Sequence, residues 1–316
     1  MSAGVATSDT ITVPPRRRAR GAIARVLAGA LRTRRGKVAA GLTLSVVVVA
    51  FIGPFIPGSD PLSFVAAPYA PPGPDGGLLG ADALGRDVLA RVLHGGWRLL
   101  ILASIATLLG VALGAVAGVS AAYLRGRYDA IVMRSVDILL ALPSLVFVLM
   151  ALSVVGPQPA LVVFVVGFVQ APQVARVMHA ASQDICERDF VKAIAILGVP
   201  AHSVIRRQVL PMLLTPLMVE AGLRLSYSIV MIAGLSFLGL GTPPPNPDWG
   251  VMVNENRIGL ASNVWGVLAP ALILAILAIG TNTFADAIAR ANFGEDRAEE
   301  FLLGATLAAT QTGTDA

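Results

Sequence analysis

The strongest constraint on this chain is a set of six apolar runs, each long enough to cross a lipid bilayer. Crossing the hydrocarbon core takes about 20 mostly apolar residues in a helix, which satisfies its own backbone hydrogen bonds. Only 14% of the residues are charged, against roughly 25% in soluble proteins. The sequence therefore predicts an all-α polytopic membrane protein with six transmembrane helices, over residues 38–56, 99–122, 130–155, 160–178, 213–234 and 265–289.

The basic residues divide unevenly between the two sides of the membrane. If the amino terminus lies inside, nine Lys and Arg residues in 1–37 and five in 175–211 face the cytoplasm, whereas Arg86, Arg91, Arg98 and Arg257 face outward. Cytoplasmic loops carry such an excess of positive charge. We therefore expect both termini in the cytoplasm.

This orientation divides the chain into five parts. The basic tail, 1–37, is expected to lie against anionic membrane lipid rather than nucleic acid. The first span, 38–56, stays uncleaved because no A-x-A-like site follows it. An extracytoplasmic segment with an interfacial helix (57–98) precedes a core of five spans (99–290), which contains a cytoplasmic loop at 179–211. The last part is a cytoplasmic tail, 291–316.

The sequence lacks the residue patterns that several kinds of chemistry require. The single cysteine, Cys186, forms no internal disulfide, and the three histidines have no metal-ligand spacing, so we expect no metal. No G-x-x-x-x-G-K-[ST] motif is present to hold a nucleotide. Gly234-Leu235-Ser236 resembles a nucleophile motif only weakly, and no histidine lies in the last span to act as its base. We expect no catalytic residues and no bound cofactor.

The stretch from Glu187 to Pro211 is a charged, punctuated segment between two apolar runs. Asp189 can cap a short helix whose apolar residues Phe190, Ala193, Ile194 and Leu197 share one stripe. Gly198 suits the left-handed position after that helix. Pro200 then fits the first turn of a second helix, and Pro211 is expected to stop it. The segment predicts two short helices that meet at a glycine and present an apolar knob to another protein.

Two pairs of opposite charges lie inside the predicted spans. Arg134 and Asp137 are three residues apart, and Glu220 and Arg224 are four apart, so each pair can form an ion pair on its helix. Charges in a span face protein or a water-filled path. We favour mutual ion pairs over solute contacts on a translocation path.

Small residues recur in the second predicted span. Gly110, Gly114 and Gly118 follow one another at intervals of four residues. This spacing predicts close approach of another helix.

Four motifs, in order along the chain, resemble those of one family. The loop motif E-A-A-x-x-x-G…L-P is matched by Ala193, Gly198, Leu210 and Pro211, with Lys192 and Ile194 replacing the usual Glu and Ala. The stretch 80–100 resembles G-T-D-x-x-G-R-D-x-x-S-R at Asp82, Gly85, Arg86, Asp87 and Arg91. The stretch 133–144 resembles M-R-x-x-D…P-S, and 233–250 matches L-S-F-L-G-L-G-x-x-P-P-x-P-x-W-G almost letter for letter. The chain thus resembles ABC importer permeases of the dipeptide, oligopeptide and nickel family, specifically their C-type subunit.

The resemblance implies a type I importer permease fold, with cytoplasmic coupling helices between spans four and five. It implies a location in the bacterial cytoplasmic membrane and partners of three kinds: a second, related permease, two cytosolic ATPase subunits that bind ATP and Mg, and an extracytoplasmic solute-binding protein. Peptides, nickel chelates, haem and glutathione all fall within such families. An ion-gradient-driven secondary transporter is the alternative; its lone midplane carboxylates and internal repeats are not found here.

The resemblance also assigns residues to these contacts. The residues expected to couple to the ATPases are Glu187, Asp189, Phe190, Lys192, Ala193, Ile194, Leu197, Gly198, Leu210 and Pro211. Those expected to meet the binding protein are Asp82, Arg86, Asp87 and Trp249.

Overall fold

The structure, a computed structural model, describes residues 28–56, 58, 60–74, 76–241 and 245–312, with side chains up to residue 291. Within these residues every regular element is helical apart from isolated β-bridges in the segment before α3. Five helices in the described residues are long and apolar enough to cross a membrane, and the number is six when a bent helix pair is counted as one span. The predicted all-α membrane protein is confirmed. Most of the 1–37 tail lies outside the described residues.

The helices follow the predicted spans closely. They are α2 (Arg34–Ile52), α3 (Val88–His94), α4 (Trp97–Leu124), α5 (Gly126–Ala141), α6 (Ser144–Val155), α7 (Pro159–Cys186), α8 (Asp189–Ile196), α9 (Ala201–Val204), α10 (Leu210–Met212), α11 (Leu214–Leu235), α12 (Trp249–Asn256) and α13 (Trp265–Thr312). Two short 3₁₀ helices, η1 (Gly53–Phe55) and η4 (Arg257–Gly259), and two short π-helices, η2 (Ile205–Val209) and η3 (Ser236–Leu240), complete them.

Some boundaries differ from the prediction. Helix α7 continues two turns beyond residue 178, so that the fourth span carries the chain past the apolar core before the loop begins. Helix α13 continues past residue 289 to Thr312, through much of the stretch predicted as a tail. The apolar run marks the bilayer crossing, whereas helical hydrogen bonding continues into the more polar residues that follow.

The third span is broken rather than merely kinked. Helices α5 and α6 meet at an angle of 83° around Leu142 and Pro143. Leu142 is extended (φ −81°, ψ 132°), the conformation favoured before a proline. Pro143 lacks the N–H that would continue the helix, so the span becomes two separate helices.

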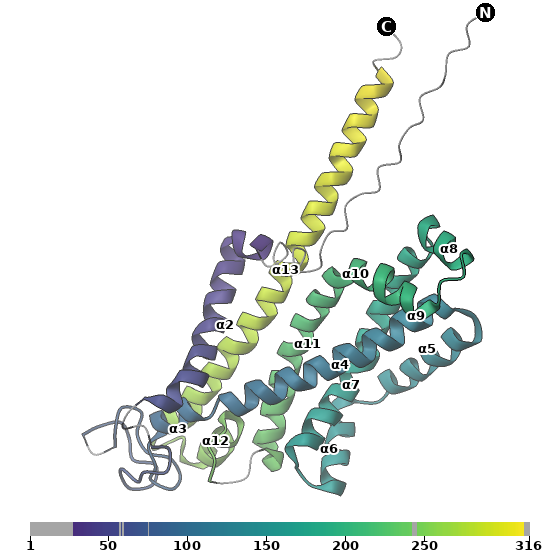
Figure 1. Cartoon of the computed structure of the whole chain (residues 1–316). Helices are drawn as coiled ribbons and strands as arrows, with labels where there is room; N and C mark the ends of the chain where they lie inside the picture. Colours follow the sequence, from purple (N-terminus) through teal and green to yellow (C-terminus); the bar gives the residue numbers. More distant parts are fainter. Residues whose placement is uncertain (1–27, 57, 59, 75, 242–244, 313–316) are drawn as a thin grey trace, which may run out of the picture.

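The closest helix pair is α4 with α7, which lie side by side over much of their length (Figure 1). A Cβ added to Gly110 would lie 2.6 Å from the backbone oxygen of Gly167, and one added to Gly114 would lie 2.5 Å from that of Ala171. Gly118 meets the backbone of Ala175 in the same way. The predicted glycine stripe is therefore the contact that brings the two backbones together.

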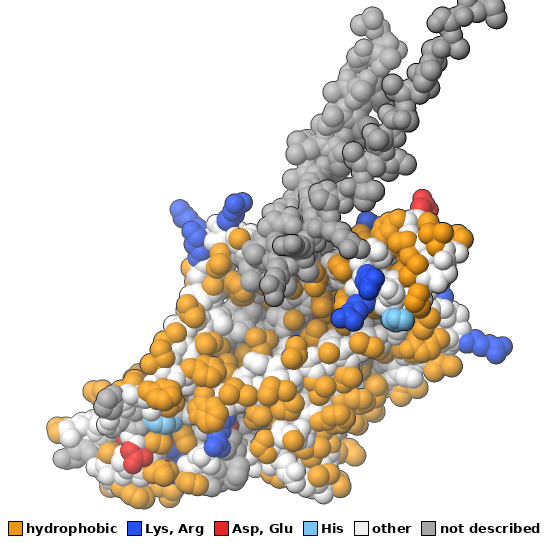
Figure 2. Space-filling view, viewed as in Figure 1, with side chains coloured by type: hydrophobic (Ala, Val, Ile, Leu, Met, Phe, Trp, Pro, Cys, Tyr) orange, Lys and Arg blue, Asp and Glu red, His pale blue; other side chains and the backbone are white. Residues whose placement is uncertain are grey.

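The core divides along the long axis of the bundle. One apolar cluster joins the half of α4 and α7 nearer α3 to α2, α3, α6, α11, α12 and α13, and a second joins their other half to the α8–α10 region. Hydrophobic side chains cover the middle of the face drawn in Figure 2, while most of its Lys and Arg side chains lie toward the end that carries α8 and the start of α2. This is the charge distribution of a membrane protein with one strongly basic side.

Candidate functional site

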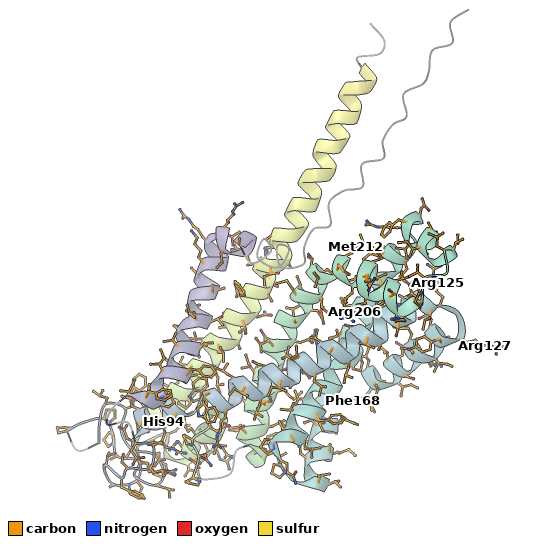
Figure 3. The ribbon with its side chains drawn as sticks, in the orientation of Figure 1. His94, Arg125, Arg127, Phe168, Arg206 and Met212 are labelled. Carbon is orange, nitrogen blue, oxygen red and sulfur yellow. The ribbon has the colours of Figure 1, made fainter. Side chains whose placement is uncertain are left out.

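The α8–α9 hairpin projects from one end of the bundle, the same end at which α2 starts, and α3 and α12 lie at the other end (Figure 1). Gly198 connects α8 to α9 with φ +77°, the left-handed conformation predicted for it. The two short helices meeting at a glycine are thus confirmed. Arg125 and Arg206 lie near this hairpin, whereas His94 lies at the opposite end (Figure 3).

Two details of the predicted hairpin are wrong. Asp189 does not cap α8; it is the first helical residue, and Arg188 precedes it without a side-chain cap. Its carboxylate still lies in the first turn, where it favours the helix dipole. Pro211 does not stop the second helix: it is the second residue of α10, which continues directly from η2. The break comes two residues later, at Leu213.

The tip of the hairpin is apolar and uncovered. Ile196 is 85% exposed and Leu197 is 80% exposed, and Phe190 and Ala193 are exposed beside them. Lys192 and Glu187 are exposed as well. The predicted stripe is correct except for Ile194, which is partly buried and packs against the base of the hairpin. Exposed large apolar side chains gathered at one place mark an interaction surface.

The base of the hairpin is anchored firmly. Val191, Val204 and Val209 are buried in the cluster that contains Met178 of α7 and Val119 of α4. The tip is therefore carried by the long helices rather than by a loose loop. At the surface, Arg125 and Glu187 form an exposed ion pair at 3.3 Å.

A buried charge cluster organises the opposite end. The cluster comprises Asp82, Arg86, Arg91 and Glu255. Asp82 Oδ1 accepts hydrogen bonds from the backbone N–H groups of Leu84 and Arg86, both at 2.8 Å. Its Oδ2 accepts from Arg86 Nε at 2.8 Å and also from Arg91. Arg91 Nη1 pairs with Glu255 Oε2 of α12 at 2.7 Å. The cluster joins three segments: the loop before α3, α3 itself and α12.

The cluster holds Asp82 ionised. Burial raises the pKa of its carboxyl, but the backbone N–H of Arg86, the Arg91 guanidinium, and the contributions of Leu84 and the Arg86 side chain together outweigh it. The pKa therefore lies below its ordinary value of 3.8. Two carboxylates balance two guanidiniums, which is the condition under which buried charges are tolerated.

Trp249 fixes α12 against α3. Its ring is fully buried, and Nε1 donates to the backbone oxygen of Val92 at 2.8 Å. The ring lies against Gly95 and Gly96, where any Cβ would meet it. Asp248 caps α12 by accepting from Gly250 N at 2.9 Å. The C-terminal side of the L-S-F-L-G-L-G motif thus forms part of the structural core.

Three of the four residues expected to meet a binding protein are wrong as surface contacts. Asp82, Arg86 and Trp249 are all buried. Asp87 is partly exposed, but its carboxylate caps α3 by accepting from Leu89 N at 2.9 Å. Arg91, which the charge bias placed on the outward-facing side, is also buried in the interior. The resemblance to the family assigned these residues to a surface contact, but Arg86 and Arg91 turn inward to Asp82 and to Glu255, which is distant in sequence.

The intramembrane charges follow the prediction in one pair only. Glu220 and Arg224 form the expected ion pair at 2.9 Å, and Arg224 also donates to Gln173 of α7. Arg134 and Asp137 do not pair: Asp137 bonds to Arg176 of α7 instead. The pairing rule within a helix missed a contact between two helices. Arg176 and Gln173 could have been noticed as polar residues inside the apolar run of the fourth span.

The apolar helices, the charges within them and the helical hairpin beyond them define a polytopic membrane protein. The chain belongs to the family of binding-protein-dependent transport system inner membrane components, whose match covers residues 110–293. This membership, with the observed crossings, assigns it the type I ABC importer permease fold that the sequence predicted.

The chain is similar to permeases over most of its length. A protein of Brucella suis with the provisional name of a peptide transport system permease protein is 33% identical over 259 residues, covering 82% of this chain and 87% of the relative. The dipeptide transport system permease protein DppC of Haemophilus influenzae is 31% identical, covering 78% and 85%. The di/tripeptide transport system permease protein DppC of Pseudomonas aeruginosa is 32% identical, covering 75% and 79%.

A solved structure is also similar. Inward-facing MetNI, a methionine ABC transporter, has 21% sequence identity and a TM-score of 0.49, over 62% of this chain and 94% of that chain.

Proposed function

We propose that this chain is the C-type permease subunit of an ATP-driven importer of di- or oligopeptides. The family assignment supports a permease, and the names of its relatives support peptides as the solute class. The subunit contributes half of the path across the bacterial cytoplasmic membrane, and both of its termini lie in the cytoplasm. A second, related permease provides the other half.

The observation that carries the coupling role is the apolar tip of the α8–α9 hairpin. Two strongly exposed aliphatic side chains, Ile196 and Leu197, stand on a base buried against α4 and α7. A partner that covers the tip gains hydrophobic burial, and the buried base passes its movement to the long helices. We assign the tip to one of two cytosolic ATPase subunits, which bind ATP and Mg; this chain itself hydrolyses nothing.

An extracytoplasmic binding protein delivers the solute at the other end. Because the charge cluster is buried, we propose that the binding protein contacts exposed apolar side chains around the cluster. These are Phe64, Leu78, Leu84 and Ile258.

A pair of matched variants tests the coupling. Leu197→Asp places a charge in the proposed contact and is expected to abolish co-purification of the ATPase subunits with the permease. Ile258→Asp changes a residue of equal exposure, 80%, at the opposite end and is expected to leave the ATPases bound. Equal ATPase recovery from both variants would contradict the assignment.

Uptake under two energy conditions separates this function from an ion-driven transporter. With ATP maintained and the proton gradient collapsed, dipeptide uptake by cells carrying the complex is expected to persist. Loss of uptake under that condition, with ATP levels measured as unchanged, would favour the secondary transporter.

A further inference from the structure

Polar side chains lie within the spans that contain α5, α7 and α11, away from the ends of α7 and α11. Arg224 is close to the middle of α11 (Leu214–Leu235), and Gln173 is close to the middle of α7 (Pro159–Cys186). Asp137 lies toward the end of α5 at which that span breaks. It is too costly for charged groups inside a span to face lipid, so they turn to protein or water.

These side chains form three successive contacts between helices. Asp137 of α5 bonds to Arg176 of α7. One turn along α7, Gln173 accepts from Arg224 of α11. One turn along α11, the hydroxyl of Tyr227 lies 2.7 Å from that of Ser144, the first residue of α6. We call this set, Asp137, Arg176, Gln173, Arg224, Tyr227 and Ser144, the polar row.

The row is only partly covered by the chain itself. Asp137 is 53% exposed and Arg176 is 56% exposed, and Gln173 is exposed between them and α11. By contrast, Glu220, which balances Arg224, is buried. A polar row that is buried on one side and open on the other needs water, a polar solute or polar groups of the second permease on its open side.

We propose that the polar row lines the aqueous path and holds the charged ends of a zwitterionic solute as it passes. The solute carboxylate exchanges into the hydrogen bonds of Arg224 and Arg176, and its ammonium group pairs with Asp137. When the path is empty, Asp137 pairs with Arg176 and Arg224 pairs with Glu220. Binding of the solute therefore exchanges existing ion pairs for new ones. This inference rests on the proposed function, because a peptide with free ends is such a solute.

Thiol labelling tests whether the row faces water, independently of any solute. In the intact transporter with Cys186→Ser, Gln173→Cys is expected to react with a membrane-impermeant thiosulfonate. The control is Leu108→Cys, an exposed apolar position at similar depth on α4. Because the thiolate reacts and lipid disfavours its charge, labelling at 173 should be about 100-fold faster than at 108. Equal, slow labelling of both would overturn the proposal.

Transport by charge variants tests the role of the row in holding solute. Arg224→Gln is expected to lower the initial rate of dipeptide uptake about 10-fold or more, the effect of losing a hydrogen bond to a charged group. Arg224→Lys should restore part of the rate, and Arg127→Gln, in the first turn of α5, should leave it unchanged. Complex recovery and ATP hydrolysis are measured alongside. Normal uptake by Arg224→Gln would overturn the proposal.

The two assays distinguish the proposals. If the unaltered transporter takes up no dipeptide while Gln173→Cys labels rapidly, the peptide function fails and the row still lines water. If the unaltered transporter takes up dipeptide normally and Gln173→Cys stays unlabelled, the proposal that the polar row lines the path is wrong and the peptide function stands.

Discussion

Replacing Asp82 with asparagine tests whether the buried charge cluster holds the 60–87 segment, which precedes α3, in place. The amide oxygen can still accept from the N–H groups of Leu84 and Arg86. The amide nitrogen, however, replaces the oxygen that accepts from the Arg86 and Arg91 side chains, so donors face donors. Removing one partner of a buried ion pair costs about 3–5 kcal/mol. Because Glu255 still pairs with both arginines, we expect the lower end.

A loss of about 3 kcal/mol raises the open population of the 60–87 segment roughly 100-fold, since each 1.4 kcal/mol is tenfold. Protease cleavage within this segment measures that population when the segment recloses faster than it is cut. The assay uses the purified complex in detergent, with size-exclusion chromatography to establish that the variant remains assembled.

Asp87→Asn is the matched control. Asp87 caps α3, and asparagine caps a helix about as well, so its expected cost is only a few tenths of a kcal/mol. If both variants are cleaved at the same rate, the charge cluster does not hold the segment and the reasoning is wrong.

Three further results are expected. Gly198→Val places a β-branched residue at φ +77°, a strain of about 1–2 kcal/mol; it should weaken ATPase co-purification or uncouple ATP hydrolysis from uptake without reducing membrane insertion. Gly114→Leu pushes a side chain into the backbone of α7 and should lower the thermal stability of the complex in detergent, whereas Gly41→Leu, which has nothing within 4 Å, should not. Because the pKa of Asp82 is lowered, the stability that its ionised form provides is fully present above its ordinary pKa and is lost only as pH falls through the lower value. Cleavage of the 60–87 segment should therefore stay constant from about pH 8 to 5 and rise only in stronger acid.

The sequence predicts the features that depend on local patterns. The apolar runs located every crossing, because length and hydropathy decide what a bilayer accepts. The positions of Gly198 and Gly114 were predictable because a left-handed turn and a close helix contact each require the absence of a side chain. Pro143 marks the break in the third span, because a proline cannot supply the N–H that would continue the helix.

What the sequence could not supply is pairing across the fold. Asp137 has a nearer cation in sequence, Arg134, yet bonds to Arg176 on a neighbouring helix. Arg86 and Arg91 read as surface groups until Glu255, more than 160 residues away, meets them. Such contacts depend on how helices pack, and neither periodicity nor spacing encodes that directly.

The close contact of α4 and α7 makes these two helices a stiff unit that runs the length of the bundle. At one end of this helix pair, the base of the hairpin is buried against α7. At the other end, only two glycines separate α4 from α3, whose preceding loop is held by the charge cluster. With backbones touching along their glycines, the two helices have little freedom to slide or flex between these ends. A displacement of the hairpin should therefore move the loop before α3 at the opposite end of the bundle as well, because the two ends are joined by one stiff helix pair.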